Sequence, residues 1–172
     1  MKVVSTIVSV FILAGVLSAC GEDPEKAKFR KELVDKALND DTRKAGDAFL
    51  LANATKSDIK VTPSGLQYRV LQAGEGASPN ITDVVTVHYE GKRIDGVVFD
   101  SSYARNKPND FPVNRVIRGW TEALSMMNKG SAWELFIPPQ LAYGATSPNE
   151  LIPANSTLVF KVELIDFKEA EQ

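Results

Sequence analysis

Apolar and polar residues alternate in short runs along the chain from residue 66 onward. Residues 66–71, 84–89, 132–137 and 157–167 each have a strand-like pattern, because side chains at every second position of a strand lie on the same face of a sheet. In the last of these runs, one face carries Leu158, Phe160, Val162 and Leu164. The pattern predicts a sheet with one face buried in a core.

A tight turn and a single helix are predicted between these strands. Asp95-Gly96 separates two short apolar runs and favours a hairpin with a type I′ turn, in which both central residues have positive φ. Only one segment of this region has apolar residues at steps of three and four, namely Val116, Ile117, Trp120, Leu124 and Met127. We therefore expect an α+β domain, with an antiparallel β-sheet wrapped around one short α-helix.

The first residues are typical of an export signal. Lys2 precedes an uncharged apolar run over residues 3–17, and the small residues Ser18 and Ala19 follow it. This run is shorter than the ~20 residues that span a bilayer. We therefore expect a signal peptide over residues 1–19 rather than a transmembrane helix.

The end of this signal resembles the lipobox of bacterial lipoproteins, in which the cysteine is lipidated and becomes the new N-terminus. The resemblance rests on Leu17-Ser18-Ala19-Cys20, and Cys20 is the only cysteine in the chain, so it has no partner for an internal disulfide. It implies a membrane-anchored protein that faces the periplasm, and Gly21 implies sorting to the outer membrane. The alternative is an ordinary secretory signal with an incidental cysteine.

Residues 22–56 are rich in Lys, Glu, Asp and Ala and predict one or two amphipathic helices. Asp40-Asp41-Thr42 is placed to end one helix and cap the next, and residues 53–62 form a polar connector. This segment is either a spacer that holds the following domain away from the membrane or a dimerisation segment. Its thin apolar stripe favours the spacer and consists of Phe29, Leu33, Ala37 and Leu38.

Composition narrows the chemistry that the chain can perform. A net charge of −2 gives no electrostatic argument for nucleic-acid binding. One histidine and one cysteine cannot build the usual metal sites, and no phosphate-binding glycine motif is found, so we expect neither a metal nor another cofactor. The histidine, His88, lies inside a strand pattern, which favours a structural role. The unusual feature is a set of aromatic residues beside turns: Tyr89, Phe99, Phe111, Trp120, Tyr143 and Phe160.

Six short segments, in order, carry a resemblance to a known family. They read VHYEG at 87–91, VVFDSS at 97–102, VIRGW at 116–120, IPP at 137–139, AYG at 142–144 and ANSTLVF at 154–160. With them the chain resembles the FKBP-type peptidyl-prolyl isomerases over residues 64–164, especially exported bacterial members similar to the macrophage infectivity potentiator. We therefore divide the chain into a lipoprotein signal peptide (1–19), a lipidated N-terminus with the helical spacer or dimerisation segment (20–60) and an isomerase domain (61–172).

The resemblance implies a proline-binding pocket with aromatic walls and with Trp120 as its floor. Its catalytic residues would be Tyr89, Phe99, Asp100 and Tyr143. The substrate would also contact Phe111, Val116, Ile117, Trp120, Ile152 and Phe160. The Tyr143 hydroxyl and the Ile117 N–H would donate hydrogen bonds to peptide carbonyls. Two residues, Arg115 and Pro148, depart from the pattern of some relatives.

The implied activity is rotation about X–Pro bonds in exported proteins. An amide resists rotation by ~18–20 kcal/mol because twisting destroys its C–N resonance. A pocket that removes water from the carbonyl and positions the peptide favours the twisted form without any nucleophile. The implied partners are proline-containing unfolded chains or peptides, macrolide inhibitors of this family, the membrane through the lipid anchor and, if the N-terminal segment dimerises, a second copy of the chain. The alternative function is a peptide-holding chaperone or binding module with weak turnover.

Overall fold

The computed structural model of the protein describes residues 24–38 and 40–169, so the predicted signal peptide and Cys20 lie outside the described residues. Within them, seven antiparallel strands form one sheet in the order β1-β2-β6-β7-β3-β4, and β5 pairs with β3. The strands are β1 (Lys60–Val61), β2 (Gln67–Gln72), β3 (Val84–Arg93), β4 (Val98–Ser101), β5 (Asn109–Pro112), β6 (Ala132–Ile137) and β7 (Leu158–Lys168). The helices are α1 (Pro24–Leu38), α2 (Asp41–Asn53) and α3 (Arg118–Met126), with 3₁₀ turns η1 (Val113–Arg115) and η2 (Pro139–Leu141).

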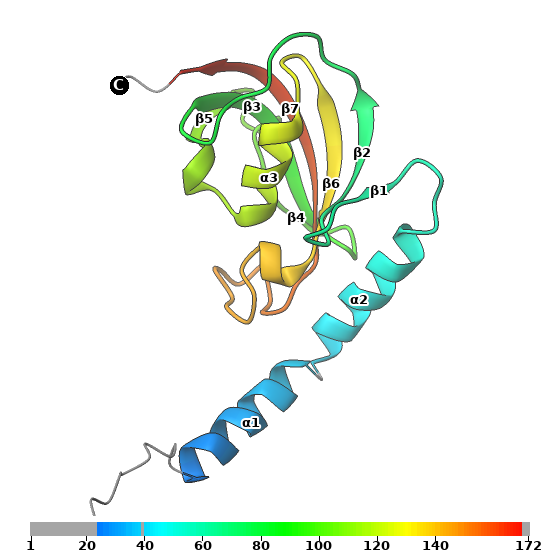
Figure 1. The fold of residues 1–172 in the computed structure, drawn as a ribbon, viewed down its shortest axis with the longest axis vertical. Coiled ribbons are helices and arrows are strands. Elements are labelled where there is room, and N and C mark those ends of the chain that lie inside the picture. Colours follow the sequence, from blue (N-terminus) through cyan, green and yellow to red (C-terminus); the bar gives the residue numbers. More distant parts are fainter. Residues whose placement is uncertain (1–23, 39, 170–172) are drawn as a thin grey trace, which may run out of the picture.

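The core lies between the sheet and α3, around which the sheet curves (Figure 1). Val85 and Val87 of β3 and Leu164 of β7 are fully buried there together with Ala123 and Leu124 of α3. Buried residues alternate with more exposed ones in β3 at 85–91 and in β7 at 160–164, because one face of the sheet covers the helix. The predicted α+β architecture, with one short helix against an antiparallel sheet, is confirmed.

β7 lies inside the sheet, between β6 and β3. It pairs with β3 from Leu158, opposite Arg93, to Lys168, opposite Val84. On its other edge it pairs with the whole of β6. β7 therefore joins the β1-β2-β6 half of the sheet to the β3-β4-β5 half.

The β3–β4 hairpin forms where Asp95-Gly96 predicted it, but with a different turn. The Gly96 N–H donates to the Arg93 carbonyl at 3.0 Å, and the Arg93 N–H donates to the Val97 carbonyl at 2.9 Å. Gly96 has a φ of +88°, whereas Asp95 does not have a positive φ. The loop therefore contains three residues, with a left-handed glycine closing it, and the type I′ prediction was wrong.

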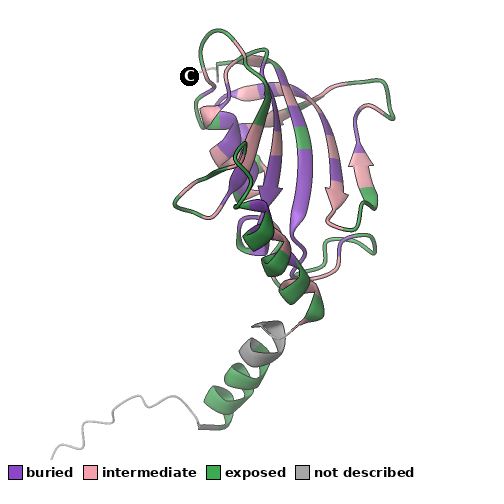
Figure 2. Ribbon diagram, turned by 90° about the vertical axis from the view of Figure 1, so that its right-hand side faces the viewer, coloured by how far each residue is buried: buried purple, intermediate pink, exposed green. Residues whose placement is uncertain are grey.

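The N-terminal segment forms two helices, as predicted. Asp40 is the N-cap of α2, and its carboxylate accepts a hydrogen bond from the Thr42 N–H at 2.7 Å, which satisfies one of the unpaired donors of the first turn. The described side chains of α1 are exposed to solvent (Figure 2). None of the helices in residues 24–38 and 40–169 is long and apolar enough to cross a bilayer.

α2, in contrast, packs against the sheet on the side away from α3. Leu50 contacts Phe136 of β6 and Val159 of β7 in a small apolar cluster. Beside it, the buried Asn53 amide donates to the Gln67 side chain at 3.0 Å, and the Gln67 amide donates to the Leu50 carbonyl at 2.9 Å. These contacts tie the predicted spacer segment to the sheet.

Candidate functional site

A cavity of about 440 Å³ opens between the N-terminal end of α3 and the β3–β4–β7 side of the sheet. Its lining comes from β3, β4, β5, β7, α3 and the segments before α3 and before β7. The structure brings all ten predicted site residues together here, with Arg115 as an eleventh: Tyr89, Phe99, Asp100, Phe111, Arg115, Val116, Ile117, Trp120, Tyr143, Ile152 and Phe160.

Trp120, in the first turn of α3, is the centre of the aromatic packing. Its ring centroid lies 5.3 Å from Tyr89, 5.3 Å from Phe160 and 5.9 Å from Phe111, each in an edge-to-face arrangement. Phe99 packs on Phe160 in the same way at 5.5 Å. Because edge-to-face pairs hold rings in fixed orientations, the walls are rigid. Trp120 and Phe160 are almost fully buried and belong to the core as well as to the cavity.

Gly91 provides space for two of these rings. It is the next inward-facing position of β3 after Tyr89, and it pairs with Phe160 of β7. A Cβ atom on Gly91 would lie 2.6 Å from Phe160 Cε1 and 2.6 Å from Phe99 Cε2. The pairing of β3 with β4 shifts at this point, since Gly91 lies opposite Asp100 and Lys92 opposite Val98. Phe99 is the extra residue of this bulge, which directs a side chain differently from a regular strand.

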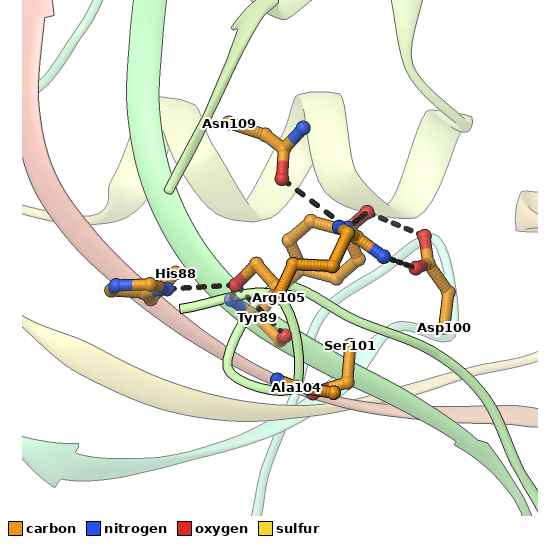
Figure 3. A network of polar contacts seen from close by, with 8 residues as sticks. His88, Tyr89, Asp100, Ser101, Ala104, Arg105 and Asn109 are labelled. Carbon is orange, nitrogen blue, oxygen red and sulfur yellow. Dashed lines mark hydrogen bonds and ion pairs between the residues drawn. The ribbon is translucent and has the colours of Figure 1, made fainter. Parts of the chain in front are cut away.

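A polar network surrounds Asp100 at the edge of the cavity (Figure 3). The Tyr89 hydroxyl donates to one carboxylate oxygen of Asp100 at 2.5 Å. The Arg105 guanidinium donates to the other oxygen at 2.5 Å, to the Tyr89 hydroxyl at 3.1 Å and to the Asn109 side chain at 3.3 Å. Every oxygen of the Tyr89–Asp100 pair is therefore engaged, which fixes the orientation of the Tyr89 ring in the wall.

The network determines the protonation of both groups. Partial burial acts to raise the pKa of Asp100, but the hydrogen bonds from Tyr89 and Arg105 and the Arg105 charge outweigh it, so this pKa is lowered. Burial raises the pKa of Tyr89, and its hydrogen bond to Asp100 adds to this effect. At neutral pH, Asp100 is a carboxylate paired with Arg105, and Tyr89 is a neutral donor.

The lining also contains the two groups that the predicted scheme uses as hydrogen-bond donors to a ligand, the Ile117 N–H and the Tyr143 hydroxyl. Ile117 is the N-cap of α3 with an extended backbone, so Val116 and Ile117 precede the helix rather than begin it. Tyr143 and Ile152 lie between η2 and β7, with the Tyr143 side chain partly exposed and Ile152 buried. Burial raises the pKa of Tyr143 and the nearby Asp100 charge adds to this, which keeps its hydroxyl protonated. Among the described residues no hydrogen-bond partner is found for the Tyr143 hydroxyl or the Ile117 N–H.

His88 lies outside the cavity lining. Its ring stacks on Tyr103 at 4.7 Å, and its Nδ1 is 2.8 Å from the Ser102 hydroxyl. Ser102 in turn accepts a hydrogen bond from the Tyr89 N–H at 2.7 Å. His88 thus supports the strand behind the site and does not face a ligand.

The sequence prediction did not include Gly91 or Arg105 among the site residues. Gly91 lies within the VHYEG segment, and its inward position in the alternation of β3 was the available signal. Arg105 lies in a loop between β4 and β5, and no local pattern indicates that it folds back on Asp100.

The cavity suits an apolar ring with a polar rim rather than group transfer. Its only carboxylate is engaged by Tyr89 and Arg105, and its lining contains no serine, threonine, cysteine, lysine or histidine. A site of this kind binds an apolar group, removes water from it and fixes neighbouring carbonyls by hydrogen bonds. The fold and the site together define an α+β domain with an aromatic cavity between its helix and its sheet.

Comparison with known proteins identifies the family of this domain. Residues 75–165 match the family of the FKBP-type peptidyl-prolyl cis-trans isomerase, and residues 16–70 match the domain amino terminal to FKBP-type peptidyl-prolyl isomerase. The chain is 50% identical over 150 residues to "Outer membrane protein MIP" of Legionella longbeachae, covering 84% of this chain and 64% of that protein. It is 53% identical over 122 residues to "Peptidyl-prolyl cis-trans isomerase Mip" of Coxiella burnetii, covering 71% and 53%.

Comparison with solved structures gives the same family. The crystal structure of FkpA from Escherichia coli aligns with a TM-score of 0.74 and 41% identity, over 86% of this chain and 70% of that chain. The protein therefore belongs to the FKBP-type peptidyl-prolyl cis-trans isomerase family. The chain spans between about half and two thirds of the length of the curated relatives that it matches first.

Proposed function

We propose that the protein is a peptidyl-prolyl cis-trans isomerase that acts on X–Pro bonds of unfolded chains and peptides. The observation that carries the proposal is the cavity of about 440 Å³, in which Trp120 forms the floor, Tyr89, Phe99 and Phe160 form walls, and no nucleophile is present. A prolyl ring is small, apolar and rigid, so it fits a pocket built from edge-to-face aromatic rings.

Rotation requires no covalent chemistry. Uncatalysed X–Pro exchange takes tens to hundreds of seconds, and an acceleration of roughly 10⁴–10⁶-fold requires about 5–8 kcal/mol of preferential binding to the twisted form. Amide resonance places negative charge on the planar carbonyl oxygen, and water stabilises that charge. A pocket that strips the water therefore disfavours the planar form relative to the twisted one.

The polar residues have positioning roles in this scheme. Tyr143 and the Ile117 N–H donate to carbonyls beside the proline, at the positive end of the α3 dipole. Asp100 orients Tyr89 through their 2.5 Å hydrogen bond rather than exchanging a proton with the substrate, because Arg105 keeps the carboxylate ionised. Val116 and Ile152 add apolar contacts to the lining of the pocket.

The proposal is tested with the chain that starts at Gly21 and a short Xaa-Pro-Phe peptide. We expect catalysed cis-to-trans exchange that a macrolide inhibitor of this family blocks. Phe99→Ala should lower kcat/KM about 10- to 100-fold, because a buried aromatic contact of about 1.5–3 kcal/mol is lost. Phe29→Ala, which removes a solvent-exposed ring of α1, is the control. Absence of turnover in the folded protein would reduce the site to a peptide-holding groove.

We also propose that the protein is a lipoprotein anchored at Cys20 on the periplasmic side of the outer membrane, with residues 1–19 removed and residues 61–172 as the isomerase domain. The Legionella relative is named as an outer membrane protein, which supports this placement. Mass spectrometry of the purified protein should find acyl chains on Cys20. In Cys20→Ser the protein should leave the membrane fraction, and a Cys20→Ser protein that stays there would reject the anchor.

A further inference from the structure

The N-terminal end of α2 contacts the segment that carries two of the pocket residues. Asp40, the N-cap of α2, accepts a hydrogen bond from the Asn155 side-chain amide at 3.3 Å with the carboxylate oxygen that does not cap the helix. The donation from the Thr42 N–H, followed by that from Asn155, lowers the pKa of Asp40. Asp40 is therefore an ionised acceptor shared between the helix and residue 155.

Asn155 closes the segment 142–157, called here the pocket loop. Its N–H donates to the Gly144 carbonyl at 2.7 Å, so the end of the loop is bonded to its beginning, next to Tyr143. Asn155 has a φ of +60° and is almost fully buried. A non-glycine residue adopts this left-handed conformation only when its surroundings hold it there.

The pocket loop is also held together by hydrogen bonds within it. The Ser147 hydroxyl donates to the Ile152 carbonyl at 2.8 Å. The Asn149 side chain accepts from the Ile152 N–H at 3.1 Å. A displacement at Asn155 is therefore transmitted to Tyr143 and Ile152, which line the cavity.

A second contact fixes α2 against the same loop. Gly46 lies on Thr157, the last residue of the pocket loop, so closely that a Cβ atom would be 2.4 Å from the Thr157 hydroxyl. One turn further on, Leu50 is buried against Phe136 and Val159. Through Gly46 and Leu50, α2 is packed against the pocket loop and the sheet. These contacts hold the N-terminal end of α2 in place, where Asp40 bonds to Asn155.

We propose that Asp40 and Asn155 are positioning residues for the pocket: through this pair, α2 holds the pocket loop and thereby sets the places of Tyr143 and Ile152. The proposal rests on the isomerase function proposed above. It makes α2 part of the catalytic unit, and it connects the N-terminal helices to substrate binding. Neither residue touches the substrate, because neither lines the cavity.

Asp40→Ser separates this role from helix capping. Serine caps a helix as well as aspartate does. Its side chain has a single oxygen, which lies one bond closer to the backbone than the carboxylate oxygens of aspartate. It therefore cannot accept hydrogen bonds from both Thr42 and Asn155. We expect KM for the peptide to rise about threefold to tenfold, the worth of one hydrogen bond, with kcat unchanged. Asp41→Asn is the matched control, because the Asp41 carboxylate is exposed and pairs only with Lys44 at 3.8 Å.

Exchanging the residue types at positions 40 and 155 tests whether restoring their hydrogen bond restores KM. Asn155→Asp keeps a residue type that tolerates positive φ but sets two carboxylates against each other, and KM should rise at least as much as in Asp40→Ser. The double variant Asp40→Asn with Asn155→Asp restores a cap and an amide-to-carboxylate hydrogen bond, and KM should return close to the wild-type value. The proposal would be overturned if the rise in KM of the double variant equalled that expected from adding the free-energy effects of its two single changes.

Amide hydrogen exchange gives a readout that does not depend on turnover. The Asn155 N–H, which is bonded to Gly144, should exchange faster in Asp40→Ser than in the wild type, and at the wild-type rate in Asp41→Asn. If the wild type shows no turnover, the proposed function fails while the exchange rates still decide whether Asp40 holds the loop. Equal exchange and equal KM in Asp40→Ser and Asp41→Asn would reject the positioning role.

Discussion

At the scale of single residues, Gly91 shows how an absent side chain shapes the site. Phe99 and Phe160 both occupy the space that a Cβ atom on residue 91 would need. Glycine serves here by its size and not by its backbone freedom, since its φ is not positive. The distance between two aromatic walls is therefore set by a residue that contributes no contact of its own.

Gly91→Ala should displace at least one of these rings. We expect a loss of stability of about 1–3 kcal/mol, which is typical of overpacking, together with a fall in kcat/KM of at least about tenfold. Urea denaturation and the peptide assay measure the two effects. Lys92→Ala, at the next position and on the opposite face of β3, should change neither quantity strongly. Full activity in Gly91→Ala would mean that the rings do not form the pocket walls.

Tyr89→Phe tests the network around Asp100. It removes one hydrogen bond to the carboxylate, so the pKa of Asp100 should rise towards its ordinary value of 3.8. Because the folded-state pKa is lowered, ionised Asp100 favours the folded state above that ordinary value, and the contribution is lost as pH falls through the folded-state pKa. An NMR titration of the Asp100 carboxyl carbon checks the direction, and an unchanged midpoint would contradict the hydrogen bond.

The sequence predicted residues of the pocket better than residues that support it. Tyr89, Phe99 and Trp120 lie in short segments that resemble the family, and the structure places them around one cavity. Arg105 bonds to Asp100 from the loop after β4, and Asn155 bonds to Asp40, which lies 115 residues earlier in the chain. Charge or amide side chains in loops give no periodic signal, so only the folded structure reveals their partners.

At the scale of elements, periodicity and the hairpin signal predicted the longer strands, β4 and the helices, whereas the short strands β1 and β5 were missed. β6 and β7 appear within one residue of the predicted bounds, because their alternation is set by one buried face. β5 contains only four residues, Asn109–Pro112, and three of them are polar or proline. β5 is a strand because it pairs with β3, although its own residues have little β propensity.

The docking of α2 was also missed, since small and polar residues carry much of it. Leu50→Ala should destabilise the protein by about 2 kcal/mol, at the lower end for a buried leucine because the cluster around it is small. Leu51→Ala is a matched control one residue away, since the Leu51 side chain is 76% exposed. Thermal unfolding of both variants measures the difference. Equal melting temperatures would show that α2 does not pack on the sheet in solution.

At the scale of the whole molecule, the two N-terminal helices differ in their surroundings. α1 presents Phe29 and Leu33 to solvent, 63% and 52% exposed, on a helix that is otherwise rich in charge. On their own, these two described side chains bury too little area for a stable interface. We therefore keep the prediction that this segment is a spacer rather than a dimerisation segment.

We therefore expect the chain that starts at Gly21 to sediment with the mass of one copy at micromolar concentration. Analytical ultracentrifugation measures this directly. A mass of two copies would make the N-terminal segment a dimerisation segment. In that case, Phe29→Ser with Leu33→Ser should return the protein to one copy, and a dimer that survived both changes would have its interface elsewhere.

The interior position of β7 has a consequence for how the protein folds. β7 is the last of the described strands in the chain, yet it separates β6 from β3. Synthesis proceeds from the N-terminus, so the strand edges of β6 and β3 that pair with β7 stay unpaired until residues 158–168 emerge. Such non-local closure slows folding and exposes unpaired strands. A protein proposed to act on X–Pro bonds of unfolded chains is itself, by its topology, a chain that completes its fold late.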